Sequence, residues 1–484
     1  MTDLDLLAEL QAQERAVLDA LAAHGLMPPD PDRARLETLP PLLRDVHELP
    51  DEALCEAIGR HVAAGVDVDA SPPDYGITAF RICRGEGKLA AMRALIRAGA
   101  RTGWSADQIA IALGEVPDAP ETGEEDPFVF ACRVGNLAAA AAYSPSLEVG
   151  ETPPGEAVLA AVRARSPELV RWLMARGFDP NAADRCGIGA LQSAVSGDDV
   201  ATAEVLLAAG ADPNGVPPKD YTSPIRSAAS EAMRALFVSR GISPFAFEYA
   251  LGPDDVRVPF LPETALTQQA FEADRSARAG RTNPERALPA FWSEQMRTGR
   301  YGAPEGMACE DDPERPVWSF HRFGRTVTPL PDGRLVLIAG EHEDFYDPDF
   351  CIYADVTVIG GADGVAHYIY PEEVFPPTDF HTATRVDDAI WLVGLLGYEG
   401  TRQEGRTQVL RLDLGDFSVA PIETTGEGPG WLHGHRAIRV PEGILVGGGR
   451  VEPGYEPNAA TYLLNLDTLD WRTQPAPGAC ETPS

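Results

Sequence analysis

A turn that recurs every 33 residues constrains the fold of this 484-residue chain more than any other feature. Residues 174–182 read M-A-R-G-F-D-P-N-A, and residues 207–215 read L-A-A-G-A-D-P-N-G. Each turn follows an apolar segment with helical spacing. Glycine suits the left-handed position just past a helix end, and short Asp and Asn side chains suit the tight turn that follows. The pattern predicts stacked helical units.

Further turns extend this pattern toward both ends of the N-terminal half. Gly65 and Gly99 are 34 residues apart, and Gly241 follows Gly210 after 31 residues. A repeat of this length is typical of a solenoid, in which each unit packs on its neighbours. The predicted turn residues are Gly65, Gly99, Gly177, Asp179, Asn181, Gly210, Asp212, Asn214 and Gly241.

The unit from Asp184 to Asn214 resembles the ankyrin family, through Gly187, Ala190-Leu191, Ala194, Gly197, Val205-Leu206-Leu207 and Gly210-Ala211-Asp212. The resemblance implies an all-α solenoid of about five or six units in residues 45–245. It also implies a concave surface that binds another protein. The family's Thr-Pro-Leu-His is replaced here by residues 189–192, Gly-Ala-Leu-Gln, which puts its helix-start hydrogen bonds in question. A stack that only supports the C-terminal half is the alternative.

The N-terminal segment, residues 1–44, is predicted to be a capping helix and a linker. Leu4, Leu7, Leu10, Val17, Leu18 and Leu21 recur mostly at three- and four-residue steps. Such a helix would cover the open end of the repeat stack, since terminal repeats need a cover. A helix that binds a partner is the alternative.

The C-terminal half has the pattern of strands and turns. Residues 246–312 are a bridging segment, 313–475 an all-β domain and 476–484 a flexible tail. Buried strands are predicted at 334–340, 389–394 and 444–449, each followed by a second strand, at 354–358, 407–413 and 461–467. Gly340, Gly394 and Gly447 are 54 and 53 residues apart. Three similar units are therefore expected.

Gly447-Gly448, Tyr462 and Trp471 make the third unit resemble a blade of the kelch family. The fold class is thus an ankyrin-repeat solenoid followed by a kelch-like partial propeller or sheet stack. Closed propellers have about four to eight blades. Residues 250–312 supply a divergent blade, or the units form an open stack covered by the repeats or by a second copy; the sequence leaves this open.

Loops at one rim of this domain concentrate acids, histidines and aromatics. Equal periods place His381 and His435 at equivalent positions, with the rim residues on one side of the domain. We expect the acids to be solvated and the side chains to spread over the rim. The candidate binding residues are Glu341, His342, Asp344, Tyr346, Asp347, Asp379, His381, Trp431, His433, His435 and Arg436. Imidazole and carboxylate together also suit a divalent metal ion.

Composition narrows the function classes. A net charge of −34 disfavours nucleic acid and anionic membranes as partners. The seven cysteines are scattered and form no C-x-x-C pair, and the acidic N-terminus lacks the features of a secretory signal. We expect a cytoplasmic, bacterial, non-catalytic adaptor or inhibitor that binds another protein and needs no cofactor or metal. The alternative is a hydrolytic or metal-dependent enzyme, or a small-ligand binder, with its site on the β rim.

Overall fold

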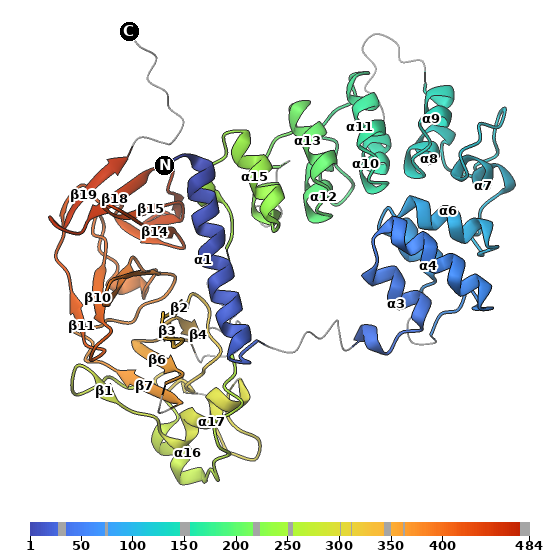
Figure 1. Cartoon of the computed structure of the whole chain (residues 1–484). Coiled ribbons are helices and arrows are strands. Elements are labelled where there is room, and N and C mark those ends of the chain that lie inside the picture. The colour runs from blue at the N-terminus through green and yellow to red at the C-terminus, as the bar shows by residue number, and fades with distance from the viewer. Residues whose placement is uncertain are drawn as a thin grey trace, which may run out of the picture. The chain divides into compact units, whose positions relative to one another are not determined.

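A computed structural model describes residues 1–27, 35–72, 76–145, 155–215, 223–249, 255–300, 302–310, 312–342, 350–361 and 364–474 (Figure 1). The chain forms two compact units. Asp30–Arg240 form the repeat unit, and Met1–Pro29 together with Gly241–Ser484 form the β unit. The predicted tail, 476–484, lies outside the described residues. Within the described part of the chain, no helix is both long and apolar enough to cross a bilayer.

The repeat unit is built from short antiparallel helix pairs, as predicted. Its helices are α3 (Pro41–Glu48), α4 (Asp51–Ala63), α5 (Ala79–Gly85), α6 (Leu89–Arg97), α7 (Ala106–Ala112), α8 (Pro127–Arg133), α9 (Leu137–Tyr143), α10 (Gly155–Arg163), α11 (Pro167–Met174), α12 (Ala190–Ser196), α13 (Val200–Ala208), α14 (Pro224–Ser227) and α15 (Glu231–Ser239). The first pair begins at Pro41, before the predicted boundary at 45, and the unit ends at Arg240 rather than 245.

The helices of the repeat unit pack in two rows. The first helices α8, α10, α12 and α14 contact one another in order, and so do the second helices α11, α13 and α15. Helix α7 is an extra element between pairs. The Asn136 side chain donates to the carbonyls of Ile111 and Glu115, and Arg93 Nε donates to that of Ala112, so the C-terminal end of α7 is capped.

Helix α12 begins without a side-chain cap, as the replaced motif predicts. Its N-cap residue is Gly189, which has no side chain to accept a backbone hydrogen bond. Gln192 instead donates from Nε2 to Ser227 Oγ of the next unit at 2.8 Å. Helix α12 is therefore tied to the next unit by a side chain within the helix and not capped at its own start.

The β unit contains the strands β1 (Glu285–Arg286), β2 (Thr326–Pro329), β3 (Leu335–Ile338), β4 (Glu341–His342), β5 (Cys351–Ile352), β6 (Asp355–Ile359), β7 (Val365–Ile369), β8 (Thr382–Val386), β9 (Ala389–Val393), β10 (Val409–Asp413), β11 (Val419–Pro421), β12 (Thr425–Gly426), β13 (Trp431–His433), β14 (Arg436–Val440), β15 (Gly443–Gly447), β16 (Arg450–Glu452), β17 (Glu456–Pro457), β18 (Thr461–Asn465) and β19 (Asp470–Gln474). It also contains α1 (Asp3–Ala23), η2 (Pro244–Ala246), α16 (Gln268–Asp274), α17 (Ala290–Thr298) and η3 (Glu399–Thr401).

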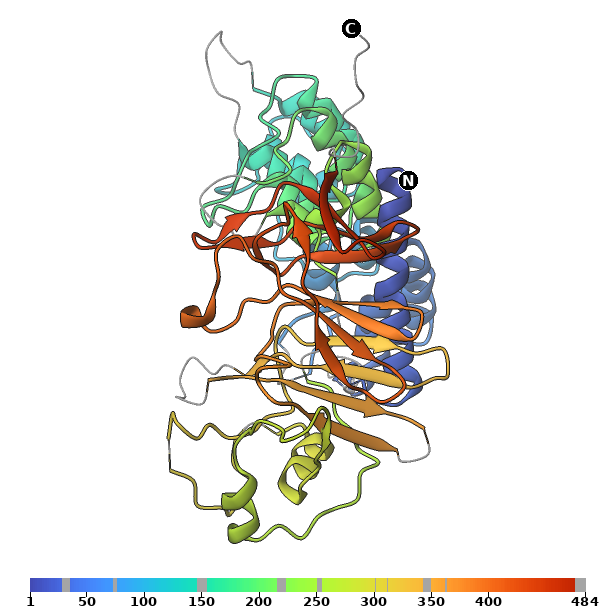
Figure 2. The same cartoon turned by 90° about the vertical axis from the view of Figure 1, so that its left-hand side faces the viewer.

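Three four-stranded antiparallel meanders organise this unit (Figure 2). They are β2-β3-β6-β7, β8-β9-β10-β11 and β14-β15-β18-β19, and each contains one of the predicted strand pairs. Their first strands are neighbours, because β8 contacts both β2 and β14. Over the described residues the sheets form an array that does not close into a barrel.

Helix α1 belongs to the β unit, so the prediction that it caps the repeats is wrong. It contacts β2 and η2 and runs beside the array (Figure 1). Val17 and Leu21 lie in a core cluster with Leu335 and Leu337 of β3. Beyond its C-terminal end, His24 Nε2 is 2.6 Å from the Gly333 carbonyl oxygen. The apolar spacing predicted the helix correctly, but it carries no information about the surface that the helix covers.

Residues 246–312 add helices and one short strand to the first sheet, not a further blade. Strand β1 pairs with β7, and Phe271 of α16 and Phe291 of α17 are buried in the same core cluster as β3. The segment predicted to be a bridge is therefore part of the β unit. At the third sheet, the Phe245 ring of η2 lies where any side chain at Gly447 would extend, 2.5 Å from an ideal Cβ.

Candidate functional site

The predicted turn glycines of the repeats have the predicted conformation. Each lies just past the end of a helix and adopts the left-handed backbone that favours glycine. The φ angles are +78° at Gly65, +90° at Gly99, +82° at Gly177, +92° at Gly210 and +86° at Gly241. An ideal Cβ at these positions meets no atom within 4 Å, so backbone conformation alone selects glycine.

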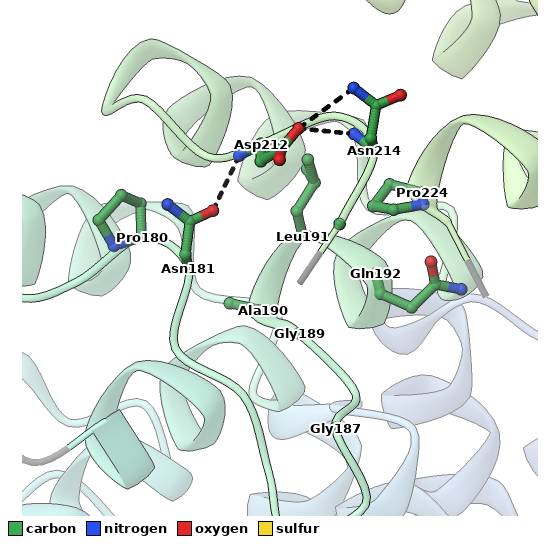
Figure 3. A pocket seen from close by; sticks show the side chains of 11 residues that line it. Pro180, Asn181, Gly187, Gly189, Ala190, Leu191, Gln192, Asp212, Asn214 and Pro224 are labelled. Carbon is green, nitrogen blue, oxygen red and sulfur yellow. Dashed lines mark hydrogen bonds between the residues drawn. The ribbon is translucent and has the colours of Figure 1, made fainter. Parts of the chain in front are cut away.

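Polar side chains order the same turns (Figure 3). Asp179 Oδ1 accepts a hydrogen bond from the Asn181 backbone at 2.8 Å, and Asp212 Oδ1 accepts one from the Asn214 backbone at 2.9 Å. The depression between these turns, with Leu191 on its wall, has a free volume of only about 10 Å³. That is room for roughly one water molecule, so the depression does not suit a small-molecule ligand.

The turns also bind one another. Asn181 Oδ1 accepts a hydrogen bond from the Asp212 backbone of the next unit at 2.8 Å. Asp69 Oδ1 accepts an equivalent bond from the Arg101 backbone at 2.9 Å. The acceptor stands four residues after the turn glycine in both cases. Hydrogen bonds of the same kind therefore join two pairs of successive turns along this edge of the repeat unit.

A short hairpin projects from the best-matching repeat. Ala183 and Gly189 pair across it, and the Asp184 backbone N–H donates to the Ile188 carbonyl at 3.0 Å. Ile188 is 39% exposed, and Ile77 at the equivalent place before α5 is 40% exposed. The sequence analysis did not single out either isoleucine, although both directly precede the N-cap of a predicted helix and could have been recognised by that position.

The rim residues of the β unit are buried rather than solvated. Exposure is 6% or less for Glu341, His342, Asp379, His381, Trp431, His433 and His435, and Arg436 is half-buried. Asp344, Tyr346 and Asp347 lie outside the described residues. The expectation of solvated acids is wrong for Glu341 and Asp379, because Glu341 lies in strand β4 and Asp379 in a loop, and neighbouring segments bury both.

His381 and His435 occupy equivalent positions, as their spacing predicts. His381 Nε2 is 2.9 Å from Thr326 Oγ1 at the start of β2, and His435 Nε2 is 3.0 Å from Thr382 Oγ1 at the start of β8. Each ring thus joins its own sheet to the preceding one. Both histidines therefore have a structural role, because they link neighbouring sheets by hydrogen bonds.

At each end of the array, one partner of the histidine–threonine pair is replaced. The position equivalent to His381 in the first unit is Arg325, whose guanidinium donates to the Phe320 carbonyl at 2.8 Å. The position equivalent to Thr326 in the third unit is Arg436, which donates to the Tyr249 carbonyl at 3.3 Å. Arginine therefore replaces one partner at each end, and both contact segments outside the sheets.

The remaining rim residues have separate surroundings. The Gly397 backbone donates to Asp379 Oδ1 at 2.7 Å, and Asp379 also interacts with Glu341. His433 Nε2 lies 3.6 Å from Glu452, while Trp431 Nε1 donates to the Leu396 carbonyl at 2.8 Å. Among the residues that the structure describes, no three His, Cys, Asp or Glu side chains are grouped to hold a metal ion.

Burial sets the charge of these groups. It lowers the pKa of His381 and of His435 to about 3, and that of His433 to about 4 although Glu452 opposes the shift. It raises the pKa of Asp379. The three rings are therefore neutral at pH 7, and neutral imidazole is the form that suits a hydrogen bond with a threonine hydroxyl.

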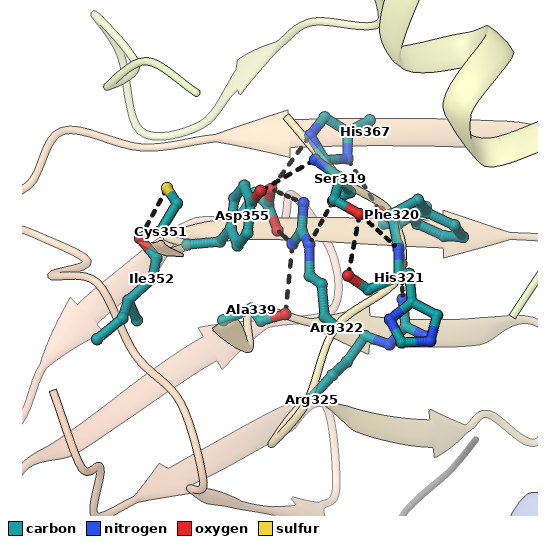
Figure 4. Close-up of polar contacts among 12 residues, drawn as sticks. Ser319, Phe320, His321, Arg322, Arg325, Ala339, Cys351, Ile352, Asp355 and His367 are labelled. Carbon is teal, nitrogen blue, oxygen red and sulfur yellow. Dashed lines mark hydrogen bonds and ion pairs between the residues drawn. The ribbon is translucent and has the colours of Figure 1, made fainter. Parts of the chain in front are cut away.

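A second polar cluster, in the first sheet, was not predicted (Figure 4). Arg322 donates from both terminal nitrogens to Asp355, with the NH2 bond at 2.9 Å. Burial alone raises the pKa of Asp355, but Arg322 and His367 more than offset this and the pKa is lowered. Arg322 also stacks 3.5 Å from the Tyr353 ring centroid. The pair is buried and fully engaged, which indicates a role in holding β6 to the segment before β2.

Comparison with protein families identifies the repeats. The model for ankyrin repeats (many copies) matches residues 158–207, from α10 to α13. Cyclin-dependent kinase 4 inhibitor B of Bos taurus is 42% identical over 78 residues, which are 16% of this chain and 59% of that protein. The Homo sapiens protein of the same name is 42% identical over 74 residues, or 15% and 53%. The chain thus spans little more than half the length of these curated relatives, and it contains ankyrin repeats.

Among solved structures, the ankyrin repeat domain of Bcl-3, a member of the IkappaB protein family, is similar to this chain. The sequence identity is 18%, and the TM-score is 0.23. The match covers 42% of this chain and 99% of that chain.

Proposed function

We propose that this protein is a non-catalytic interaction protein whose repeat unit binds a partner protein, as an adaptor or inhibitor. The partner would lie against the concave face, which is formed by the first helices and the projecting turns. The observation that carries the proposal is the exposure of Ile77 and Ile188, each directly before the N-cap of the first helix of its repeat.

An apolar residue before the N-cap ordinarily packs on the first turns of its own helix. Ile77 and Ile188 instead leave about two fifths of their surface in solvent. Single exposed apolar side chains are common, but these two occupy the same place before the first helix of their repeats. The hydrogen bonds of Asn181 and Asp69 keep the turns that they join in one conformation, which reduces the entropy cost of binding.

The class of partner follows from charge and from the relatives. The net charge of −34 repels phosphate, which supports a protein in place of nucleic acid or an anionic membrane. The curated relatives are kinase inhibitors by name, which supports inhibition of a partner enzyme. A cytoplasmic location and a bacterial source both stay predictions from the sequence. The curated relatives are mammalian.

We also propose that the β unit is kelch-like. Three successive four-stranded meanders with adjacent first strands support this, as does Trp471, whose Nε1 donates to Thr424 at 3.1 Å. In this proposal the array has three blades, and α1 and η2 cover the place where further blades would continue.

A photo-cross-linking experiment tests the binding face. A benzoylphenylalanine at position 188 of the full chain should cross-link one partner protein in cells. The variant Ile77→Asp with Ile188→Asp should lose that partner in pull-downs while its melting temperature stays the same, because both side chains are exposed.

Val116 supplies the matched control. It is 43% exposed but follows α7 rather than preceding a helix in a repeat turn. Val116→Asp should retain the partner. Equal loss of the partner in the control and in the paired isoleucine variant would contradict the proposed face.

A further inference from the structure

Three cavities adjoin one another along the β unit. The first, of about 590 Å³, lies between the segment 277–279 and the first sheet and includes Trp318 and Phe350. The second, of about 390 Å³, shares Glu372, Pro377 and Tyr398 with the first. Because the same side chains line both, the two cavities meet across Tyr398.

The third cavity continues the series toward the third sheet. It has a volume of about 340 Å³ and shares Arg406, Thr407 and Ile422 with the second. Trp471 lies on its wall. We call the three together the β groove. A row of adjoining compartments suits an elongated ligand better than a compact one.

Aromatic side chains recur along the β groove. Phe350 and Tyr398 stack edge to face with ring centroids 5.6 Å apart. Phe350 is 40% exposed. Trp431 follows in the second cavity and Trp471 in the third. Phe350 and the half-buried Tyr398 therefore offer rings against which an apolar stem or a cation can pack, whereas Trp431 and Trp471 are 6% and 3% exposed and form apolar wall.

The unpaired charges of the β groove are negative. Its arginines are engaged, since Arg278 lies 2.6 Å from Glu285 and Arg406 lies 3.1 Å from Glu423. Glu314, Glu372 and Glu373 are exposed and make no ion pair with other described residues. The groove therefore favours a cationic ligand.

The whole β unit has the same charge bias. Its segments, 1–29 and 241–484, contain 43 acidic residues against 20 arginines and no lysine, whereas 30–240 contain 31 acidic and 20 basic residues. This excess attracts positively charged partners over several ångströms, before contact. Charge complementarity at the groove and across the unit points to the same ligand class.

We propose that the β groove binds an extended, lysine- or arginine-rich segment of a partner protein. Aromatic rings beside free carboxylates are the surroundings that bind long cationic side chains, through stacking of the stem and charge pairing of the head. An extended chain directs every second side chain to the same face, so alternate side chains can enter the compartments in order. This site lies in the β unit and does not depend on the repeat-turn contacts of the proposed function.

The test is a selection of random peptides, each about twelve residues and roughly 40 Å long when extended, on the full-length protein. Enriched peptides should carry several Lys or Arg residues. The best peptide, labelled with fluorescein, should bind by anisotropy. Glu372→Gln with Glu373→Gln should weaken its affinity by about fivefold or more.

Glu442→Gln with Glu456→Gln is the matched control. It changes the net charge equally, at exposed residues that do not line the β groove. The control should weaken binding by less than twofold, and the melting temperature should show that both variants fold. Ile77→Asp with Ile188→Asp should leave peptide binding intact, which separates this proposal from the one for the repeats.

Four results would overturn the proposal. The first is that the enriched peptides lack basic residues, and the second is that no peptide is enriched. The third is that both pairs of Glu→Gln substitutions weaken binding equally, which would indicate unspecific attraction to an acidic protein. A benzyltrimethylammonium probe that binds as tightly as the best peptide would assign a small cation to the groove instead.

Discussion

The two units join their repeated elements in different ways. In the repeat unit, exposed turns bind through short polar side chains, as Asn181 does with the Asp212 backbone. In the β unit, buried histidines bind threonines of the preceding sheet, as His381 does with Thr326. The first joint is local and needs no desolvation of a titratable group. The second requires a neutral ring in the interior, so it depends on pH.

The units also differ in how far apart in the sequence their contacting segments lie. The array of sheets is covered by α1, whose Leu21 contacts residues more than 300 positions later in the chain. Contacts in the repeat unit extend mainly from one helix pair to the next. A solenoid is therefore stabilised by nearest neighbours, whereas the β unit depends on its distant N-terminal segment.

Acid should produce the largest difference in stability between the two units. His367, His381, His433 and His435 have lowered pKa values of about 3 to 4, so the unfolded β unit binds more protons below about pH 6.5. Stability present above pH 6.5 should fall steadily toward pH 4, although the raised pKa of Asp379 opposes this. Hydrogen exchange corrected for intrinsic rates should accelerate in β2–β19 more than in α8–α13. Equal acceleration in both units would contradict the difference.

Removing the Leu21 side chain should be the next largest effect. Leu21 is completely buried in the core of the β unit, so Leu21→Ala should cost about 2–5 kcal/mol there. Hydrogen exchange should accelerate in β3 and leave α8–α13 unchanged. Leu4→Ala is the control, since Leu4 is 52% exposed. Acceleration confined to α3–α6 would restore the idea of a repeat cap.

Breaking one histidine–threonine joint should have an intermediate effect. Thr326→Val keeps the shape of the side chain but leaves His381 Nε2 without its partner, at a cost of about 1–3 kcal/mol. Thr382→Val should cost the same at His435, because the two joints are equivalent. Thr425→Val, at an exposed strand, should change denaturant midpoints little. Unequal losses at the two joints would show that the sheets are not equivalent.

Strain at a repeat turn should have the smallest effect. Gly210 has φ of +92° and no atom near an ideal Cβ, so Gly210→Val acts through the backbone alone. We expect a loss of about 1 kcal/mol or more, measured by urea denaturation. Gly59→Ala, inside α4 with no close neighbour, should stabilise by about 0.5–1 kcal/mol. A gain at Gly210 would contradict the left-handed turn.

Local periodicity determined the helix pairs, the turn glycines and the three strand pairs. Gly177 and Gly210 were predictable because only glycine adopts the left-handed turn without strain, and that requirement repeats with the unit. Equal spacing likewise predicted that His381 and His435 are equivalent. These features depend on residues close together in the chain or on a regular repeat length, and both can be identified from the sequence alone.

Only the tertiary structure decided what these elements contact. The apolar stripe of α1 fits any apolar surface, so its spacing did not separate a repeat cap from a cover for the β unit. The burial of Glu341 and Asp379, the Arg322–Asp355 pair and the β groove arise where segments distant in sequence meet. Burial and pairing of charges depend on these tertiary contacts. Composition shows which charged groups are present, but not which of them are desolvated.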